Sequence, residues 1–174
     1  RRRPTRRRRN GRNPLDTLRN EHGLIRQSLD NLTVAIEKMQ EGRLPKREFF
    51  EKAVRFAKDF ADQFHHHKEE HLMFVQVAQK KHGEIDGQIA ALRHQHETGR
   101  DYMTEINGSM VGYEDGNPVT VGRVLECTSA YVSMLRAHIH REDHVVFPMA
   151  AELLTHEDME ILEGDFERVR EKAG

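Results

Sequence analysis

The chain has 174 residues, enough for one domain with a substantial core, and only 36% of them are hydrophobic. No apolar run approaches the roughly 18 residues that a membrane span needs, and no apolar signal-peptide segment follows the first residues. The single cysteine, Cys127, excludes an internal disulfide and a cysteine-rich zinc module, and we expect it to serve packing alone. The composition therefore predicts a cytoplasmic protein that does not bind membranes.

The net charge of −1 hides an uneven distribution of charge along the chain. Residues 1–12 contain eight arginines and no acid, and the rest of the chain carries 20 basic and 29 acidic residues, a net charge of −9. An arginine run without apolar periodicity cannot bury surface, so we expect residues 1–12 to form a flexible basic arm and residues 13–174 to form the domain. The arm could bind the phosphates of a nucleic acid, although its lack of aromatic residues and the acidic body favour a simple solvated terminus.

From residue 13 onward, the spacing of apolar residues predicts helices. Asn13 followed by Pro14 is typical of a helix start, and apolar residues then recur every three or four positions until Gly42. Pro45 is expected to open a second helix, which Gly83 closes.

The second half of the chain repeats this organisation. A third helix is expected from about residue 85, and the glycine- and asparagine-rich stretch 107–117 is expected to be one long loop. Pro118 then opens a fourth helix, and Thr155 with Asp158 predicts a capping box before a short terminal helix. The sequence therefore predicts an all-α protein, an up-down-up-down four-helix bundle with a short C-terminal helix.

Each of the four predicted helices carries a histidine on or beside its apolar face: His22, His65, His96 and His138. Two of these are followed four residues later by a glutamate, Glu69 and Glu142, so that each pair lies on one side of its helix. Burying such groups without partners would cost several kcal/mol each, about as much as a domain's whole stability. Nitrogen and carboxylate ligands on facing helices suit two iron or manganese ions.

Two motifs strengthen this interpretation. The run HHHKEEHLMF at 65–74 and the run HIHREDHVVFP at 138–148 resemble the paired signatures of hemerythrin-like HHE cation-binding domains. Glu21-His22 and His96-Glu97 are similar to the other two family positions, and the resemblance covers about residues 14–172. It implies a left-handed four-helix bundle with a non-haem di-iron centre, in which Glu69 and Glu142 bridge the metals and His22, His65, His96 and His138 are terminal ligands.

More than one pair of residues in the second predicted helix could supply the metal ligands. His65–Glu69 and His66–Glu70 both have the required spacing, and His67–His71 is a third pair nearer the centre of the apolar arc. The spacing of the two glutamates before Leu72-Met73 resembles that of the oxygen-carrying hemerythrins and favours His65–Glu69.

The fourth helix offers a similar choice. Asp143 would satisfy the spacing of the oxygen carriers, but matching the Lys-Glu-Glu of 68–70 to the Arg-Glu-Asp of 141–143 favours Glu142. The remaining histidines His82, His94 and His156 fall on outer faces, where we expect them to be exposed.

Two positions bear on function. Oxygen-carrying hemerythrins have a second histidine four residues after the helix-three ligand, where this chain has Arg100, and the loss of one nitrogen should leave an open metal position. Tyr131 lies seven residues before His138 on the same face, from which it could act as a ligand, a hydrogen-bond donor or a redox shield. A tyrosine packed in the core is an equally good interpretation.

The predicted function is that of a non-haem di-iron protein that binds a small oxidant, O2, peroxide or nitric oxide, for sensing or for redox detoxification. If the protein is an enzyme, it consumes peroxide or nitric oxide at this site. The alternative is a protein that binds nucleic acid or another anionic partner through the arm, with a regulatory or structural metal. The sequence is compatible with a monomer or a homodimer.

Overall fold

The computed structural model describes residues 12–174. Almost all of the predicted basic arm lies outside these residues. The prediction that the arm is flexible and the alternative that it binds nucleic acid therefore both fall outside the described part of the chain.

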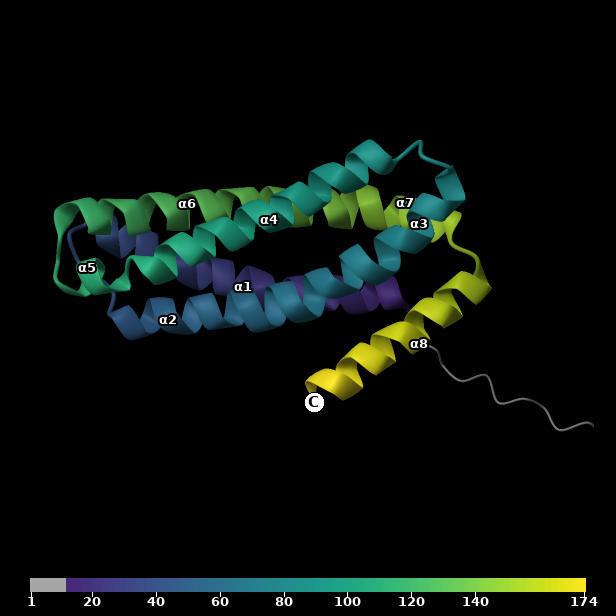
Figure 1. The fold of residues 1–174 in the computed structure, drawn as a ribbon, viewed down its shortest axis with the longest axis horizontal. Helices are drawn as coiled ribbons and strands as arrows, with labels where there is room; N and C mark the ends of the chain where they lie inside the picture. The colour runs from purple at the N-terminus through teal and green to yellow at the C-terminus, as the bar shows by residue number, and fades with distance from the viewer. Residues whose placement is uncertain (1–11) are drawn as a thin grey trace, which may run out of the picture.

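Four long helical runs lie side by side along the long axis of the molecule (Figure 1). The elements in chain order are α1 (Pro14–Gln40), α2 (Arg47–Phe56), η1 (Ala57–His66), η2 (Glu69–Met73), α3 (Phe74–Lys81), α4 (Asp86–Gly108), α5 (Met110–Glu114), α6 (Pro118–Arg141), η3 (Glu142–Val146), α7 (Phe147–Leu153) and α8 (His156–Ala173). The η segments are π-helical and continue the α-helices on either side, so α2 to α3 form one run and α6 to α7 form another. Residues 12–174 contain no strand, which confirms the predicted all-α class.

Side-chain caps begin three of these helices where the sequence predicts them. Asn13 Oδ1 accepts a hydrogen bond from the Leu15 amide at 2.9 Å, and Asn117 Oδ1 accepts from the Val119 amide at 3.0 Å. Thr155 begins α8 with a complete capping box, in which its own amide donates to the Asp158 carboxylate at 2.8 Å. These caps satisfy amides that a helix cannot bond internally at its first turn.

The second helix begins two residues later than predicted, at Arg47 rather than Pro45. Lys46 has an extended backbone, with φ −66° and ψ 149°, and the carbonyl of Pro45 accepts a hydrogen bond from the Tyr113 hydroxyl. This contact holds Pro45 in the connection instead of the first helical turn.

The prediction of one long loop at 107–117 is wrong. The helix α4 continues to Gly108, and α5 forms a further short helix whose Met110 and Tyr113 are buried. Burial of these apolar side chains outweighs the local preference of the glycines for turns. The terminal helix α8 is also longer than predicted, since it has 18 residues.

The core is divided into two apolar clusters by a layer of buried polar side chains. The cluster on the α5 side is formed by residues such as Ile25, Leu29, Phe50, Ala61, Met103, Tyr131 and Leu135. The cluster on the α7 side is formed by residues such as Leu15, Leu18, Met73, Phe74, Leu92, Val146 and Phe147. Between these clusters lie one buried histidine from each long run and two buried glutamates: His22, His65, His96, His138, Glu69 and Glu142. We call this level of the molecule the histidine layer.

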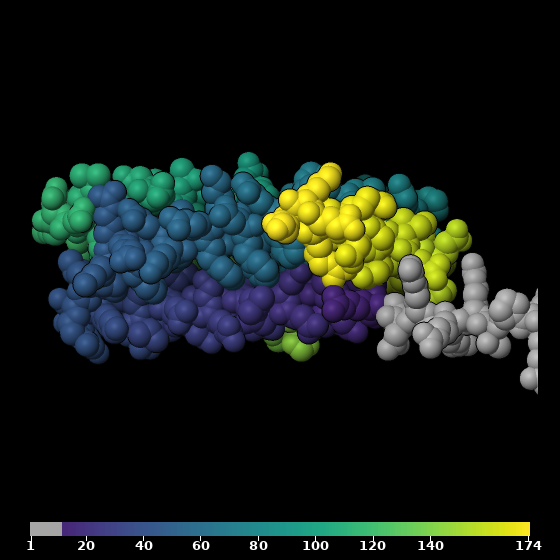
Figure 2. Space-filling view, turned by 90° about the horizontal axis from the view of Figure 1, so that it is seen from below, coloured from purple at the N-terminus to yellow at the C-terminus, as the bar shows by residue number. Residues whose placement is uncertain are grey.

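The helix α8 folds back and covers the outside of α1 and the second run (Figure 2). Its Leu162 and Phe166 are fully buried in the α7-side cluster. None of the helices within residues 12–174 is both long and apolar enough to span a bilayer.

Candidate metal centre

The histidine layer brings the six residues of the predicted ligand set together in two overlapping groups. One group contains His22, His65, Glu69 and Glu142, and the other contains Glu69, His96, His138 and Glu142. Within each group, one potential ligand atom per residue lies within 4.8 Å of the others. The two carboxylates, Glu69 and Glu142, belong to both groups.

The polar atoms at the middle of the layer lack the partners that burial demands. Glu69 and Glu142 are completely buried, and none of their four carboxylate oxygens has a hydrogen-bond partner within residues 12–174. The Nε2 atoms of His22 and His65 are likewise without a hydrogen bond from this part of the chain. His65 Nε2 lies 2.5 Å from a Glu69 oxygen and His22 Nε2 lies 3.4 Å from a Glu142 oxygen, but neither pair has hydrogen-bond alignment.

These orphaned atoms match what a metal requires. An unsatisfied buried carboxylate costs several kcal/mol, and a cation between the two carboxylates would remove that cost. Imidazole nitrogens and carboxylate oxygens are the donors that iron and manganese accept. The residues of the histidine layer therefore fit a metal centre.

The other ring nitrogen of each histidine is held from outside the layer. The contacts are His22 Nδ1 to Asp143 at 2.7 Å, His65 Nδ1 to Glu21 at 2.9 Å, His96 Nδ1 to Glu70 at 2.7 Å and His138 Nδ1 to Gln95 at 2.6 Å. Nδ1–H donation leaves Nε2 free to bind a cation and fixes the ring orientation. Glu70 and Asp143, the alternative carboxylates of the sequence analysis, thus lie outside the layer and orient histidines.

The protonation states in the layer also suit metal binding. Burial lowers the pKa of His138 to about 3 and the pKa of His96 well below 6.5, so both rings are neutral near pH 7. Burial alone would raise the pKa of Glu69, but the nearby His65 outweighs it and brings this pKa to about 2. Neutral imidazoles and an ionised carboxylate are the forms that coordinate metals.

A fifth histidine, His66, also lies in the layer. It is 6% exposed and stacks on His96 with ring centroids 3.6 Å apart, and with His96 and His138 it forms a third group of potential ligands. The spacing of the sequence offers His66–Glu70 as an alternative to His65–Glu69, and the structure buries both histidines. The segment η1 is π-helical, and its wider turn lets both side chains point inward.

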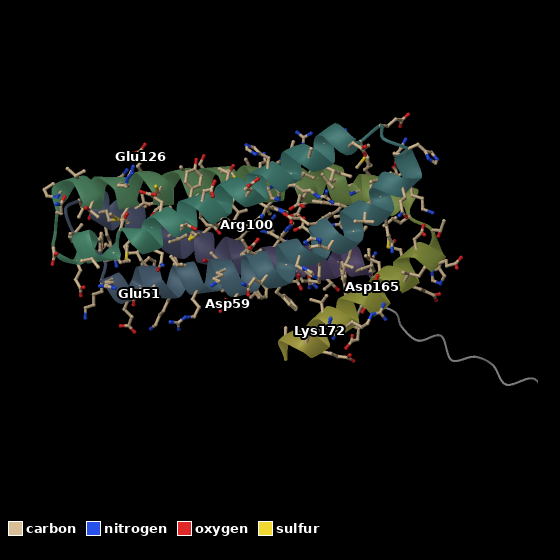
Figure 3. The ribbon with its side chains drawn as sticks, viewed as in Figure 1. Glu51, Asp59, Arg100, Glu126, Asp165 and Lys172 are labelled. Atoms are coloured by element: carbon tan, nitrogen blue, oxygen red, sulfur yellow. The ribbon has the colours of Figure 1, made fainter. Side chains whose placement is uncertain are left out.

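Arg100 lies at the middle of α4, beside the helix formed by α2 and η1 (Figure 3). It does not enter the layer, since its guanidinium donates to Asp62 at 2.8 Å and to Glu70 at 3.1 Å. Arg100 therefore holds the carboxylate that in turn orients His96.

A cavity of about 340 Å³ leads from the surface near Arg100 to the histidine layer. His66 and His96 form part of its wall, together with Tyr131, which is 6% exposed and packs against Gly99. Burial raises the pKa of the Tyr131 hydroxyl, so this group is a neutral potential donor beside the layer.

Sequence analysis missed the role of Lys68, which is completely buried. Its ammonium group pairs with Glu21, which also accepts from His65, and it lies 3.8 Å from the centre of the Phe64 ring. The ring of Phe166 in α8 also lies near this ammonium group, with its centre 5.3 Å away. The position of Lys68 within the apolar stripe of its helix was the available signal, because a buried lysine requires an anionic partner.

Comparison with known proteins agrees with this geometry. The model of the family described as hemerythrin HHE cation binding domain matches residues 13–150. The uncharacterized protein Rv1995 of Mycobacterium tuberculosis and the uncharacterized protein Mb2018 of Mycobacterium bovis are each 23% identical over 142 residues, which are 82% of this chain and 54% of the relative. The chain thus spans about half the length of the curated relatives it matches, and no solved structure matches it.

An all-helical domain with a buried layer of histidines and glutamates defines a helical cation-binding protein. The family match covers most of the chain and includes every residue of the histidine layer. The chain belongs to the hemerythrin HHE cation-binding domain family.

The metal-free protein is predicted to lose stability as the pH falls. Because the pKa values of His96 and His138 are lowered on folding, the unfolded chain binds these protons first, near pH 6.5. Each ring then destabilises the fold by roughly 1.4 kcal/mol per pH unit below this value, so the stability is fully present above pH 6.5 and lost below it. Melting temperatures of metal-free protein at about pH 7 and about pH 5.5 measure the effect.

Matched variants assign this pH dependence to the layer. His138→Leu is expected to reduce the difference between the two melting temperatures, whereas His94→Leu at an exposed position of α4 leaves it unchanged. Equal melting temperatures of the parent at both pH values would contradict the prediction.

Replacement of Lys68 by methionine is expected to lower the free energy of unfolding by about 3 kcal/mol, because it leaves the Glu21 carboxylate buried without its cation. Urea unfolding measures the change. The control is Lys80→Met, which removes a partly exposed ion pair with Asp158 and should cost less than about 1 kcal/mol. A Lys68 variant no less stable than the Lys80 variant would show that the buried pair has no structural role.

Proposed function

We propose that the chain holds two iron ions in the histidine layer of an up-down-up-down helical bundle and uses them to bind and reduce a small oxidant. The observation that carries this proposal is that the two ligand groups share Glu69 and Glu142. A single ion would need only one of these groups, and structural zinc is satisfied by four ligands. Manganese accepts the same donors and is the alternative metal.

The residues divide between the two ions according to their groups. His22 and His65 would bind one ion, His96 and His138 would bind the other, and Glu69 and Glu142 would bridge them. His66 lies beside the second pair and could supply a further nitrogen there. This nitrogen would replace the one that the oxygen carriers obtain from a second histidine, at the position where this chain has Arg100.

Two irons supply paired one-electron chemistry, which suits the reduction of O2, peroxide or nitric oxide. The protein around them controls access and surroundings. The apolar clusters on both sides of the layer exclude water, and the cavity beside Arg100 provides one route from the surface. Tyr131 could donate a hydrogen bond to a ligand in this cavity, because its hydroxyl stays protonated.

The position of the cavity favours catalytic turnover of a small molecule over its simple transport. The cavity wall contains His66 and His96 but none of His22, His65 and Glu142, so a small molecule would approach one side of the centre. A metal that keeps one accessible position is the usual arrangement for catalysis. We therefore propose consumption of peroxide or nitric oxide as the activity, with sensing of the same molecules as its non-catalytic counterpart.

The iron content of matched variants tests the proposed centre. The parent chain is expected to bind about two irons, and Glu142→Gln is expected to bind less than about one, because a neutral amide cannot replace a bridging carboxylate. Glu126→Gln is the control, since Glu126 is exposed on the same helical run (Figure 3). Elemental analysis of purified, correctly folded proteins gives the values, and equal iron in all three would refute the assignment of Glu142.

The activity is tested on the same proteins. Reduced, iron-loaded parent protein should consume peroxide or nitric oxide with a change in its iron absorption spectrum, and Glu142→Gln should lose most of this response. A parent protein that holds two irons but responds to neither molecule nor to O2 would overturn the proposed function while leaving the metal centre intact.

A further inference from the structure

Two pairs of histidines on the surface are not used by the metal centre. They are His67–His71 and His140–His144, which we call the outer histidine pairs. All four side chains are exposed, unlike the histidines of the layer, so the placement of His67–His71 nearer the centre of the apolar arc is wrong. The members of each pair are four residues apart on a continuous helical run, where such residues are neighbours.

The outer pairs occupy equivalent places in the two motifs. Each begins two residues after an inner histidine–glutamate pair, at 67 after 65 and at 140 after 138. Two residues correspond to roughly half a helical turn, so a pair displaced in this way lies on the opposite side of the helix from the inner pair. The same arrangement therefore occurs twice, on two different helical runs.

The rings of each pair lie side by side. Their centroids are 4.8 Å apart in His67–His71 and 4.3 Å apart in His140–His144, and the ring planes are tilted by 42° and 45°. The helix backbone holds both rings on one side, so a second imidazole is already close when the first one binds an ion. The exposed His82, His94 and His156 lie at other positions and have no histidine four residues away.

Two imidazoles with this spacing form a chelate for a divalent transition metal. Histidines at i and i+4 on one helix face provide two of the ligands in zinc-binding helices, and imidazole also suits copper and nickel. Magnesium and calcium prefer oxygen donors and are not candidates. Because the pairs are exposed, water can complete the coordination of the ion.

We propose that each outer histidine pair binds one divalent transition-metal ion at the surface, with Cu²⁺ bound more tightly than Ni²⁺ or Zn²⁺. These sites are separate from the histidine layer in position, in ligand type and in accessibility. The chain would then carry two surface metal sites in addition to its buried centre, and the inference does not depend on the identity of the buried metal.

An immobilised metal ion separates surface sites from buried ones, because a chelate fixed to a resin cannot reach completely buried histidines. Untagged, folded protein should be retained on a Ni²⁺ or Cu²⁺ resin. The double variant His71→Ala, His144→Ala breaks both pairs and should elute at a clearly lower imidazole concentration. The matched control His82→Ala, His94→Ala removes two exposed histidines but no pair, and should elute like the parent.

Two results would overturn the inference. One is a pair-breaking variant that is retained as strongly as the parent, and the other is a control variant that loses as much retention as the pair-breaking one. Glu142→Gln is expected to be retained like the parent, so that failure of the buried centre and failure of the outer sites give different results.

Copper binding in solution gives the stoichiometry. Iron-loaded protein titrated with Cu²⁺ should bind two copper ions per chain outside the buried centre, His71→Ala should bind one, and the pair-breaking double variant should bind none with comparable affinity. Loss of one imidazole should weaken a site by about 10²-fold, since the second ligand no longer binds intramolecularly. Unchanged copper binding by the double variant would refute the proposal.

Discussion

Two buried carboxylates that find no hydrogen-bond partner within residues 12–174 impose the constraint on which the rest of this structure depends. Glu69 and Glu142 are completely buried within the histidine layer, and the neighbouring Nε2 atoms of His22 and His65 also have no hydrogen bond from the described part of the chain. Such a layer is unfavourable unless a cation occupies the space between these atoms. The fold supports the layer by placing an apolar cluster on each side of it, which keeps water out.

A second set of charges holds the layer from outside. The carboxylates of Glu21, Glu70 and Asp143 accept hydrogen bonds from histidine Nδ1 atoms, and each also forms an ion pair with a basic side chain. The basic side chains are Lys68, Arg100 and Arg26 respectively. These chains of basic side chain, carboxylate and imidazole fix the ring orientation of His22, His65 and His96 without any metal.

The helix α8 contributes to this outer set. Its Phe166 lies near the ammonium group of Lys68, which pairs with the carboxylate that orients His65. A contact made by the last helix of the chain is thereby connected to the metal centre through two side chains. This gives α8 a structural role beyond covering α1 and the second helical run.

Periodicity was sufficient to locate the four long helical runs, and it placed a histidine on or beside the apolar face of each of them. It was not sufficient for His66, since the π-helical segment η1 departs from the α-helical repeat of apolar residues. The stretch 107–117 reads as a loop from its glycines, yet burial of Met110 and Tyr113 makes part of it helical. Pairings between distant residues, such as Lys68 with Glu21, depend on the tertiary fold and have no local signature.

Anomalous diffraction at the iron absorption edge from crystals of iron-loaded protein would show whether two cations share Glu69 and Glu142. We expect two anomalous peaks in the histidine layer, one beside His22 and His65 and the other beside His96 and His138, with both carboxylates between them. A single peak, or peaks outside the layer, would rule out the shared carboxylates.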